Sequence, residues 1–213
     1  MTRLLKVNTR LPEPEAIAQA AELLRRGEVV AIPTDTFYGL AANPFDEQAA
    51  EKVFAIKGRP KNNPLLLLVD SIEMATDLAA ELPAQFGRLA ERFWPGPLTM
   101  VVKATSKLPA EITANTGTIG LRLPSAPVAV ALVSAAGFPI TATSANRTGE
   151  PDAATAAQVE HSLGERLVLI LDGGPSQAAK PSTVVRLTGP EYEVLREGAI
   201  SRHEIADFLA GRS

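Results

Sequence analysis

Helix-like and strand-like segments alternate along most of this chain, and this alternation restricts the fold more than any other feature of the sequence. Apolar residues at helical spacing and capping signals predict helices near residues 14–26, 46–58, 71–80, 83–93, 127–136 and 201–209. Short apolar or β-branched runs predict strands near residues 28–33, 65–69, 98–103, 118–123, 139–143, 166–171, 182–187 and 192–196. Several strands follow one another late in the chain, which favours an α/β fold with a mixed sheet over a doubly wound parallel one.

Size and composition indicate a single globular domain over residues 1–213. The chain has 46% hydrophobic and 21% charged residues, and no low-complexity tract or linker interrupts it. Its formal net charge is −3. A protein that mainly coats duplex nucleic acid is usually basic because it neutralises phosphates, so the composition argues against that class.

Scarce residue types exclude several kinds of site. The chain has no cysteine, which excludes disulfides, zinc–thiolate sites and cysteine nucleophiles. Its histidines are His161 and His203, which leaves little from which to build a histidine-rich metal site or a Ser-His-Asp triad. The N-terminus has no long apolar segment, and no run approaches the roughly 20 apolar residues of a membrane span. We therefore expect a cytoplasmic protein with no membrane partner.

A basic segment precedes one of the predicted strands. Lys57, Arg59 and Lys61 lie within five residues, Pro60 and Pro64 stiffen the segment, and the apolar run 65–69 follows. Cations on a stiffened loop favour a pre-organised anion site, because arginine offers a planar fork and lysine a compact charge to phosphate or carboxylate. An ordinary charged surface loop is the alternative, and the segment alone does not decide between them.

Polar side chains also gather at the ends of predicted strands. Residues 34–36 follow the strand at 28–33 and either cap a turn or line a pocket at the carboxyl end of that strand. Arg122 alternates with apolar neighbours, so it lies on the inner side of its strand and needs an anionic partner, either structural or a substrate. No GxxxxGK[ST] or GxGxxG motif accompanies these clusters. A nucleotide would therefore need another kind of cradle.

Ordered motif blocks connect these features. They are PTDTFYGL (33–40), KGRPKNNPL (57–65), WPGPLT (94–99), GLRLP (120–124), TSANRTG (143–149), PSTVV (181–185) and LREG (195–198). In this order they resemble the YrdC-like family of threonylcarbamoyl-AMP synthases. The resemblance spans a core of about residues 15–198 and implies the short, single-domain form of that family.

The resemblance also implies a fold and a reaction. The fold is a mixed, twisted sheet with flanking helices and a concave, electropositive cavity. In the reaction, L-threonine, bicarbonate or CO2, and ATP give threonylcarbamoyl-adenylate and pyrophosphate, which makes the enzyme a nucleotidyltransferase. The product serves the threonylcarbamoyl-adenosine modification of tRNA, so tRNA or tRNA-modifying transferase proteins are implied as partners. Mg2+ is expected with the triphosphate, held mainly by phosphate oxygens and water, with no protein metal ligand identified.

Matching the motifs position by position implies the site residues. The expected phosphate-binding residues, the first two also named as catalytic, are Lys57, Arg59 and Asn63. The expected nucleotide contacts are Thr118, Asn146 and Arg196. The expected threonine contacts are Thr36, Arg122, Ser144 and Ser182, with Arg122 binding the carboxylate. Such a set positions reactants and neutralises charge without a protein nucleophile.

Departures from the family pattern occur at three positions. Asp35 stands where glutamate is common, Thr148 where serine is usual, and Leu68 where many members have a histidine. The Leu68 difference bears on amino-acid selectivity.

Other functions remain open at this point. One is a non-catalytic RNA-binding module, another is a carbamoyl-adenylate-forming relative of the hydrogenase-maturation type, and a third is a paralogue that binds nucleotide without turnover. Pyrophosphate release that depends on ATP separates the enzymes from the binding modules.

Overall fold

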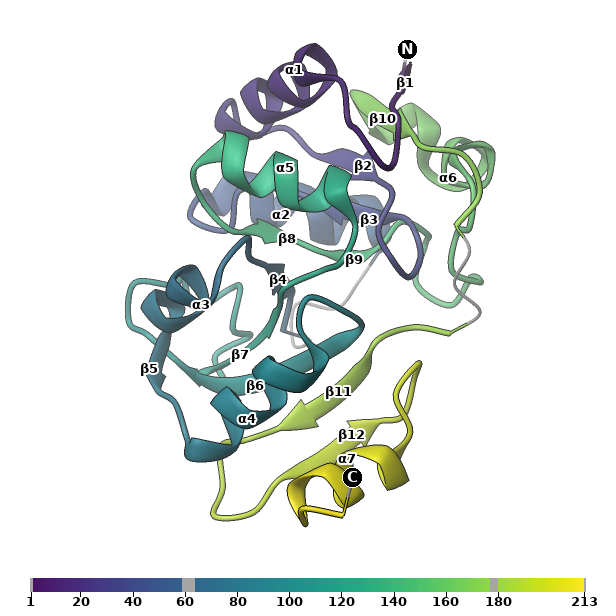
Figure 1. The fold of residues 1–213 in the computed structure, drawn as a ribbon. Coiled ribbons are helices and arrows are strands. Elements are labelled where there is room, and N and C mark those ends of the chain that lie inside the picture. Colours follow the sequence, from purple (N-terminus) through teal and green to yellow (C-terminus); the bar gives the residue numbers. More distant parts are fainter. Residues whose placement is uncertain (1, 59–63, 177–179, 213) are drawn as a thin grey trace.

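The computed structural model describes residues 2–58, 64–176 and 180–212 (Figure 1). Its strands pair into two mixed sheets. The first sheet has the strand order β1 (Arg3–Lys6), β10 (Leu169–Asp172), β2 (Val30–Ile32), β3 (Gly39–Ala41) and β9 (Thr143–Ser144). Strand β10 runs parallel to β1 and β2, whereas β3 is antiparallel to β2 and β9.

The second sheet carries most of the later strands. Its order is β12 (Glu193–Arg196), β11 (Thr183–Arg186), β6 (Leu98–Ala104), β7 (Thr118–Arg122), β4 (Leu66–Leu68) and β8 (Ile140–Thr141), with β5 (Ala79–Glu81) paired to β6. Strands β11 and β6 are parallel, as are β4 and β7, and the other pairs are antiparallel. The expected mixture of strand directions is confirmed, but the expectation of one sheet is wrong. Sequence patterns mark a strand, whereas its partners depend on packing between distant segments.

The two sheets meet where the chain passes from β8 to β9. The strand predicted at 139–143 divides here, so that Ile140–Thr141 pairs in the second sheet and Thr143–Ser144 in the first. Between them, the Thr141 amide donates to the Ala42 carbonyl and the Ala142 amide to the Leu66 carbonyl. This segment therefore places residues of both sheets close to one another.

Helices begin and end largely at the expected residues. They are α1 (Pro14–Arg25), α2 (Glu47–Lys57), α3 (Ile72–Leu78), α4 (Ala84–Phe93), α5 (Pro127–Ala136), α6 (Ala156–Leu163) and α7 (Arg202–Leu209), with a 3-10 turn at Gly164–Arg166. The Asp46 carboxylate caps α2 by accepting from two amides of its first turn, and Gly58 ends it in the left-handed conformation at φ 61°. Ser201 caps α7 by accepting from the Glu204 amide, as its sequence signature predicts.

Sequence patterns do not predict some of the helices and strands. Strands β1, β3 and β5 are too short to show a clear alternation, and helix α6 was not predicted. A signal for α6 was present, because Thr155 and Gln158 form a reciprocal capping box at its start.

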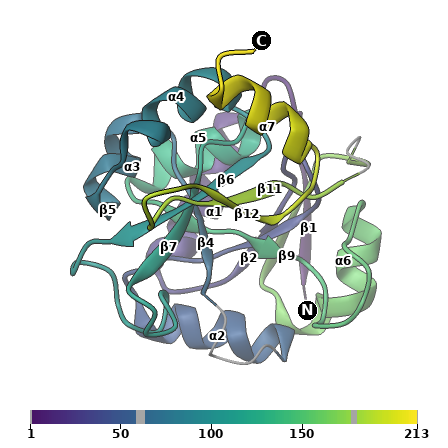
Figure 2. The same ribbon diagram turned by 90° about the horizontal axis from the view of Figure 1, so that it is seen from below.

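Two apolar clusters form the core. Helices α1 and α5 pack against each other, and their buried residues join those of β2 and β10 in the smaller cluster (Figure 1). The larger cluster extends through the second sheet to α4 and to α7, which lies beside α4 (Figure 2). None of the described helices is both long enough and apolar enough to cross a membrane.

Candidate functional site

A cavity of about 750 Å3 is lined by residues of both sheets. The first sheet contributes residues of β3 and β9, and the second contributes residues of β4, β6, β7, β11 and β12. Its size lies within the range of small-molecule sites. The cavity lies beside the β8–β9 segment that connects the sheets, so the pairing of that segment determines which side chains meet there.

Most of the predicted site residues line this cavity. The structure brings together Thr36, Thr118, Arg122, Ser144, Ser182 and Arg196. Lys57 and Asn146 are described but are not among the lining residues, and Arg59 and Asn63 lie outside the described residues. The proposed threonine-binding set is therefore collected completely, and the proposed nucleotide set only in part.

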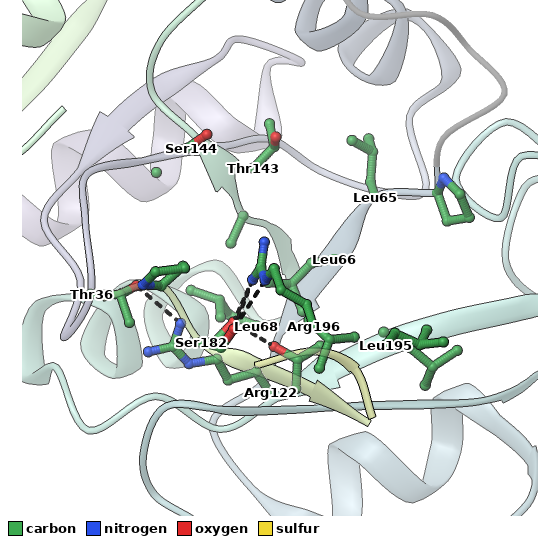
Figure 3. A pocket seen from close by; sticks show the side chains of 18 of the residues that line it. Thr36, Leu65, Leu66, Leu68, Arg122, Thr143, Ser144, Ser182, Leu195 and Arg196 are labelled. Atoms are coloured by element: carbon green, nitrogen blue, oxygen red, sulfur yellow. Dashed lines mark hydrogen bonds between the residues drawn. The ribbon is translucent and has the colours of Figure 1, made fainter. Parts of the chain in front are cut away.

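The Arg122 side chain is buried at the end of β7 (Figure 3). Its Nε donates to the Gly96 carbonyl at 3.0 Å, and its Nη1 donates to Thr36 Oγ1 at 3.2 Å. Its Nη2 lies 2.6 Å from Asp35 Oδ1 in an ion pair. The anionic partner that the sequence left open is thus, within the described structure, a carboxylate of the protein.

The turn after β2 orients the hydroxyl of Thr36. Thr34 Oγ1 accepts from the Thr36 amide at 3.1 Å, lies 3.0 Å from Thr36 Oγ1, and donates to the Phe37 carbonyl at 2.7 Å. Ser176 also donates to the Thr36 carbonyl. Both interpretations of this segment therefore hold, because Thr34 forms the turn and also lines the cavity with Thr36.

A second arginine, Arg196 of β12, lines the same cavity. Arg196 Nη2 donates to the Ser182 carbonyl at 2.9 Å and to Ser182 Oγ at 3.1 Å (Figure 3). Ser182 Oγ lies 3.0 Å from Thr99 Oγ1. Burial lowers the pKa of the Arg196 guanidinium, the charge of Asp152 opposes that shift, and the charge of Arg122 adds to it. Arg122 and Arg196 thus both line the cavity.

Lys57 and Asn146 form a buried arrangement behind Ser144. Lys57 Nζ donates to the Asn146 carbonyl at 2.8 Å, to Asn146 Oδ1 at 3.1 Å and to the Ser144 carbonyl. Ser144 Oγ donates to Asn146 Oδ1 at 2.6 Å, and Asn146 Nδ2 donates to the Glu150 carbonyl. These contacts hold the segment after β9 in place. Direct phosphate binding by Lys57 and Asn146 stays a prediction.

The sequence analysis did not predict that three further residues line the cavity or pair with a site residue. Thr99 lines the cavity and is buried, Asp152 lines it from the segment before α6, and Asp35 pairs with Arg122. Thr99 ends the WPGPLT block, so its motif membership was an available signal. Asp152 gave none, because it precedes a helix that the patterns did not reveal.

Comparison with known proteins gives consistent matches. The sequence model of the Sua5/YciO/YrdC family, described as "Telomere recombination", matches residues 22–198. The threonylcarbamoyl-AMP synthase of Pyrococcus abyssi is 39% identical over 98% of this chain and 61% of its own length. A protein of Mycobacterium tuberculosis described as a putative threonylcarbamoyl-AMP synthase is 37% identical over 91% of this chain and 88% of its own length.

A solved structure extends the likeness to the fold. The crystal structure of Pyrococcus abyssi Sua5 complexed with L-threonine matches with a TM-score of 0.94 at 38% identity, over 98% of this chain and 61% of that protein. The chain thus spans about three fifths of the length of this archaeal relative.

Proposed function

The chain belongs to the Sua5/YciO/YrdC family, and from that membership and its cavity we propose that it is a threonylcarbamoyl-AMP synthase. The proposed reaction joins L-threonine, bicarbonate or CO2, and ATP to give threonylcarbamoyl-adenylate and pyrophosphate. The observation that carries this proposal is the convergence of two arginines and several hydroxyls, from both sheets, on one cavity of about 750 Å3. Such a lining suits an anionic ligand with hydrogen-bonding groups.

The amino-acid half of the proposed site lies around Arg122. Its guanidinium would bind the threonine carboxylate, and Thr36, Ser144 and Ser182 would supply hydroxyl contacts. The relative whose structure holds L-threonine supports this substrate. Leu68, a wholly buried residue that lines the cavity, contributes to its apolar part.

The nucleotide half lies around Arg196. Arg196 and Thr118 line the cavity and would contact the nucleotide. Asn146, which is not a lining residue, is proposed to contact the nucleotide as well. For the phosphates we retain Lys57, Arg59 and Asn63, on the strength of the sequence motif. With Arg122 and Arg196 in one cavity, we also propose that its potential is electropositive.

The proposed chemistry needs placement and charge neutralisation. Addition of CO2 to the neutral amine of threonine, with loss of a proton, gives a carbamate whose oxygen is already anionic. That oxygen forms a bond to the α-phosphorus of ATP, and the bond to the leaving pyrophosphate breaks. The chain's part is to align the two substrates and to balance their charges with its arginines and lysine.

Mg2+ is proposed to accompany ATP. Within the described residues there is no cluster of three or more potential metal-binding side chains, and Asp152 is the carboxylate that lines the cavity. This donor set fits a cation held mostly by phosphate oxygens and water, as Mg2+ commonly is with nucleotides. Its contribution would be to neutralise phosphate charge.

The wider setting is also a proposal. The product would pass to tRNA modification in the cytoplasm, either directly on tRNA or through transferase proteins. Residues 1–213 would act as a single domain, which the backbone hydrogen bonds joining the two sheets support.

The test is pyrophosphate release by the purified protein with ATP, with and without L-threonine and bicarbonate. Arg122→Ala is the site variant, and Arg202→Ala, which alters an exposed arginine on α7, is the matched control. Release that requires both co-substrates, falls at least about a hundredfold in Arg122→Ala and persists in Arg202→Ala is the expected result. Release independent of threonine, or none in the wild-type protein, contradicts the proposed function.

A further inference from the structure

Asp35 has no part in the substrate contacts assigned above, yet it is the carboxylate paired with Arg122. Its Oδ1 lies 2.6 Å from Arg122 Nη2, and the two side chains are 12% and 4% exposed. Asp35 is not among the described residues that line the cavity, so it approaches the guanidinium from the protein side. A buried arginine requires such a counter-charge, because removing an ion from water is costly.

Contacts from separate segments of the chain fix the orientation of the Arg122 guanidinium. The Gly96 carbonyl accepts from Nε at 3.0 Å, and Thr36 Oγ1 accepts from Nη1 at 3.2 Å. Because Asp35 and Thr36 are neighbours in one turn, that turn contacts both terminal nitrogens of Arg122. The second oxygen of Asp35 is fixed in turn by Ser125, whose Oγ donates to Oδ2 at 3.1 Å.

The Asp35–Arg122 ion pair balances charge and occupies one of the two terminal nitrogens of the guanidinium. Oδ1 and Nη2 lie 2.6 Å apart, and both atoms are buried. Arginine has five N–H donors, and those of Arg122 that are engaged in hydrogen bonds lie on Nε and Nη1. Nη2 is buried against Asp35, so a ligand reaches Nη1, whose second N–H group remains beside Thr36 at the cavity.

We propose that Asp35 is a positioning residue: through the ion pair with Nη2 it holds Arg122 in the orientation in which Nη1, beside Thr36, can receive the carboxylate of the amino-acid substrate. The identity of that substrate rests on the proposed function. A glutamate is common at this position in the resembling family, and it keeps the carboxylate on a longer side chain. The charge at position 35, rather than the aspartate itself, is thus the feature on which Arg122 depends.

The kinetic test compares Asp35→Asn with Asp35→Glu. The asparagine variant keeps the shape of the side chain but removes its charge, so we expect the KM for L-threonine to rise about tenfold or more while the KM for ATP stays within about twofold. The glutamate variant should recover most of the threonine KM. Asp207→Asn on α7, which removes a carboxylate paired with Arg212, is the matched control for loss of one negative charge.

A second measurement reads Arg122 directly and needs no substrate. In the 15N NMR spectrum of the arginine side chains, the Arg122 Nε–H signal is assigned by its loss in Arg122→Lys. Asp35→Asn should shift or broaden this signal and speed its hydrogen exchange, whereas Asp35→Glu and Asp207→Asn should not. This readout follows the orientation of the guanidinium and not overall activity.

The outcomes separate the two proposals. If the wild-type protein does not turn over threonine but the Arg122 signal responds to Asp35→Asn alone, the proposed function fails and the positioning role stands. An unchanged signal with an unchanged threonine KM overturns the positioning role. A lower threonine KM in Asp35→Asn also overturns it, because Asp35 would then compete with the charge of the ligand. A loss of both substrates' binding that Asp35→Glu does not restore would assign a structural role only.

Discussion

Lys57 Nζ, at the end of α2, lies 2.8 Å from the main-chain oxygen of Asn146 and 3.1 Å from its side-chain oxygen. The lysine is 4% exposed, so this contact joins a helix and the segment after β9 inside the protein. It orients Ser144, which lines the cavity next to it. The cation that the sequence suggested for phosphate thus also holds part of the site in place.

Lys57→Met tests this structural role. The substitution keeps an unbranched chain but leaves the oxygens of Ser144 and Asn146 without their charged donor, so the free energy of unfolding should fall by about 3 kcal/mol. Urea denaturation measures the change. Lys52→Met is the control, because Lys52 is 41% exposed in its ion pair with Glu28 and should cost less than about 1 kcal/mol. Equal losses in the two variants would contradict the assignment.

Arg196→Lys tests the nucleotide half of the site. Lysine cannot reproduce the fork that donates to the Ser182 carbonyl and hydroxyl, so the KM for ATP should rise about tenfold with a smaller change for threonine. Steady-state kinetics of pyrophosphate release provides both values. Arg202→Lys on α7 should leave both unchanged. A rise confined to threonine would move Arg196 to the amino-acid half.

Gly120→Ala tests the space in the cavity. A Cβ at this position would lie 3.2 Å from Thr99 Cγ2, and Thr99 in turn contacts Ser182. Displacement of Thr99, and through it of Ser182, should lower turnover about tenfold and reduce stability by about 1–3 kcal/mol. Gly87→Ala is the comparison, since Gly87 lies in α4 with nothing within 4 Å of its Cβ, and it should stabilise the protein by up to about 1 kcal/mol. Full activity in Gly120→Ala would show that ligands do not use this part of the cavity.

The raised pKa of Tyr38 leads us to expect a loss of stability at alkaline pH. Burial raises the pKa of its hydroxyl to about 12, while the Gly173 amide opposes the shift. Because the folded pKa lies above the unfolded value of about 10, the folded state keeps the proton longer. This stability is fully present below about pH 10 and is lost as the pH rises towards 12.

Denaturation midpoints between pH 9 and pH 12 measure the effect, within the range that the Tyr38 pKa sets. Tyr38→Phe should remove this part of the pH dependence, and Tyr192→Phe, which alters a residue that is not fully buried, should not. An identical slope in wild type and Tyr38→Phe would contradict the origin of the effect.

Local signals in the sequence predicted much of the secondary structure. The helix that Asp46 caps ends at Gly58 as expected, because both signals act within a few residues of the chain. The strand carrying Arg122 was found from its alternation, and so was the burial of that arginine. Helix α6 was not predicted, because its apolar pattern is weak and its capping box was recognised only in the structure.

The site, too, could be predicted only in part from the sequence. The motif blocks named the residues, and the cavity collects Thr36, Arg122, Ser144, Ser182 and Arg196 from five separate blocks. The blocks could not show that Lys57 faces protein oxygens, or that Asp35 pairs with Arg122 across 87 positions of sequence. These contacts join segments that are distant in sequence, and the packing of such segments has no local signature.

By itself, then, the sequence determined the fold class, the limits of most elements and the chemical types at the site, because caps, periodicity and motif spacing act over short stretches of chain. The tertiary structure alone decided that the strands form two sheets, that the segment from β8 to β9 joins them, and which charge lies opposite which. Those features depend on how distant segments bury their apolar faces together, and a buried charge such as Arg122 acquires its partner only when that packing is complete.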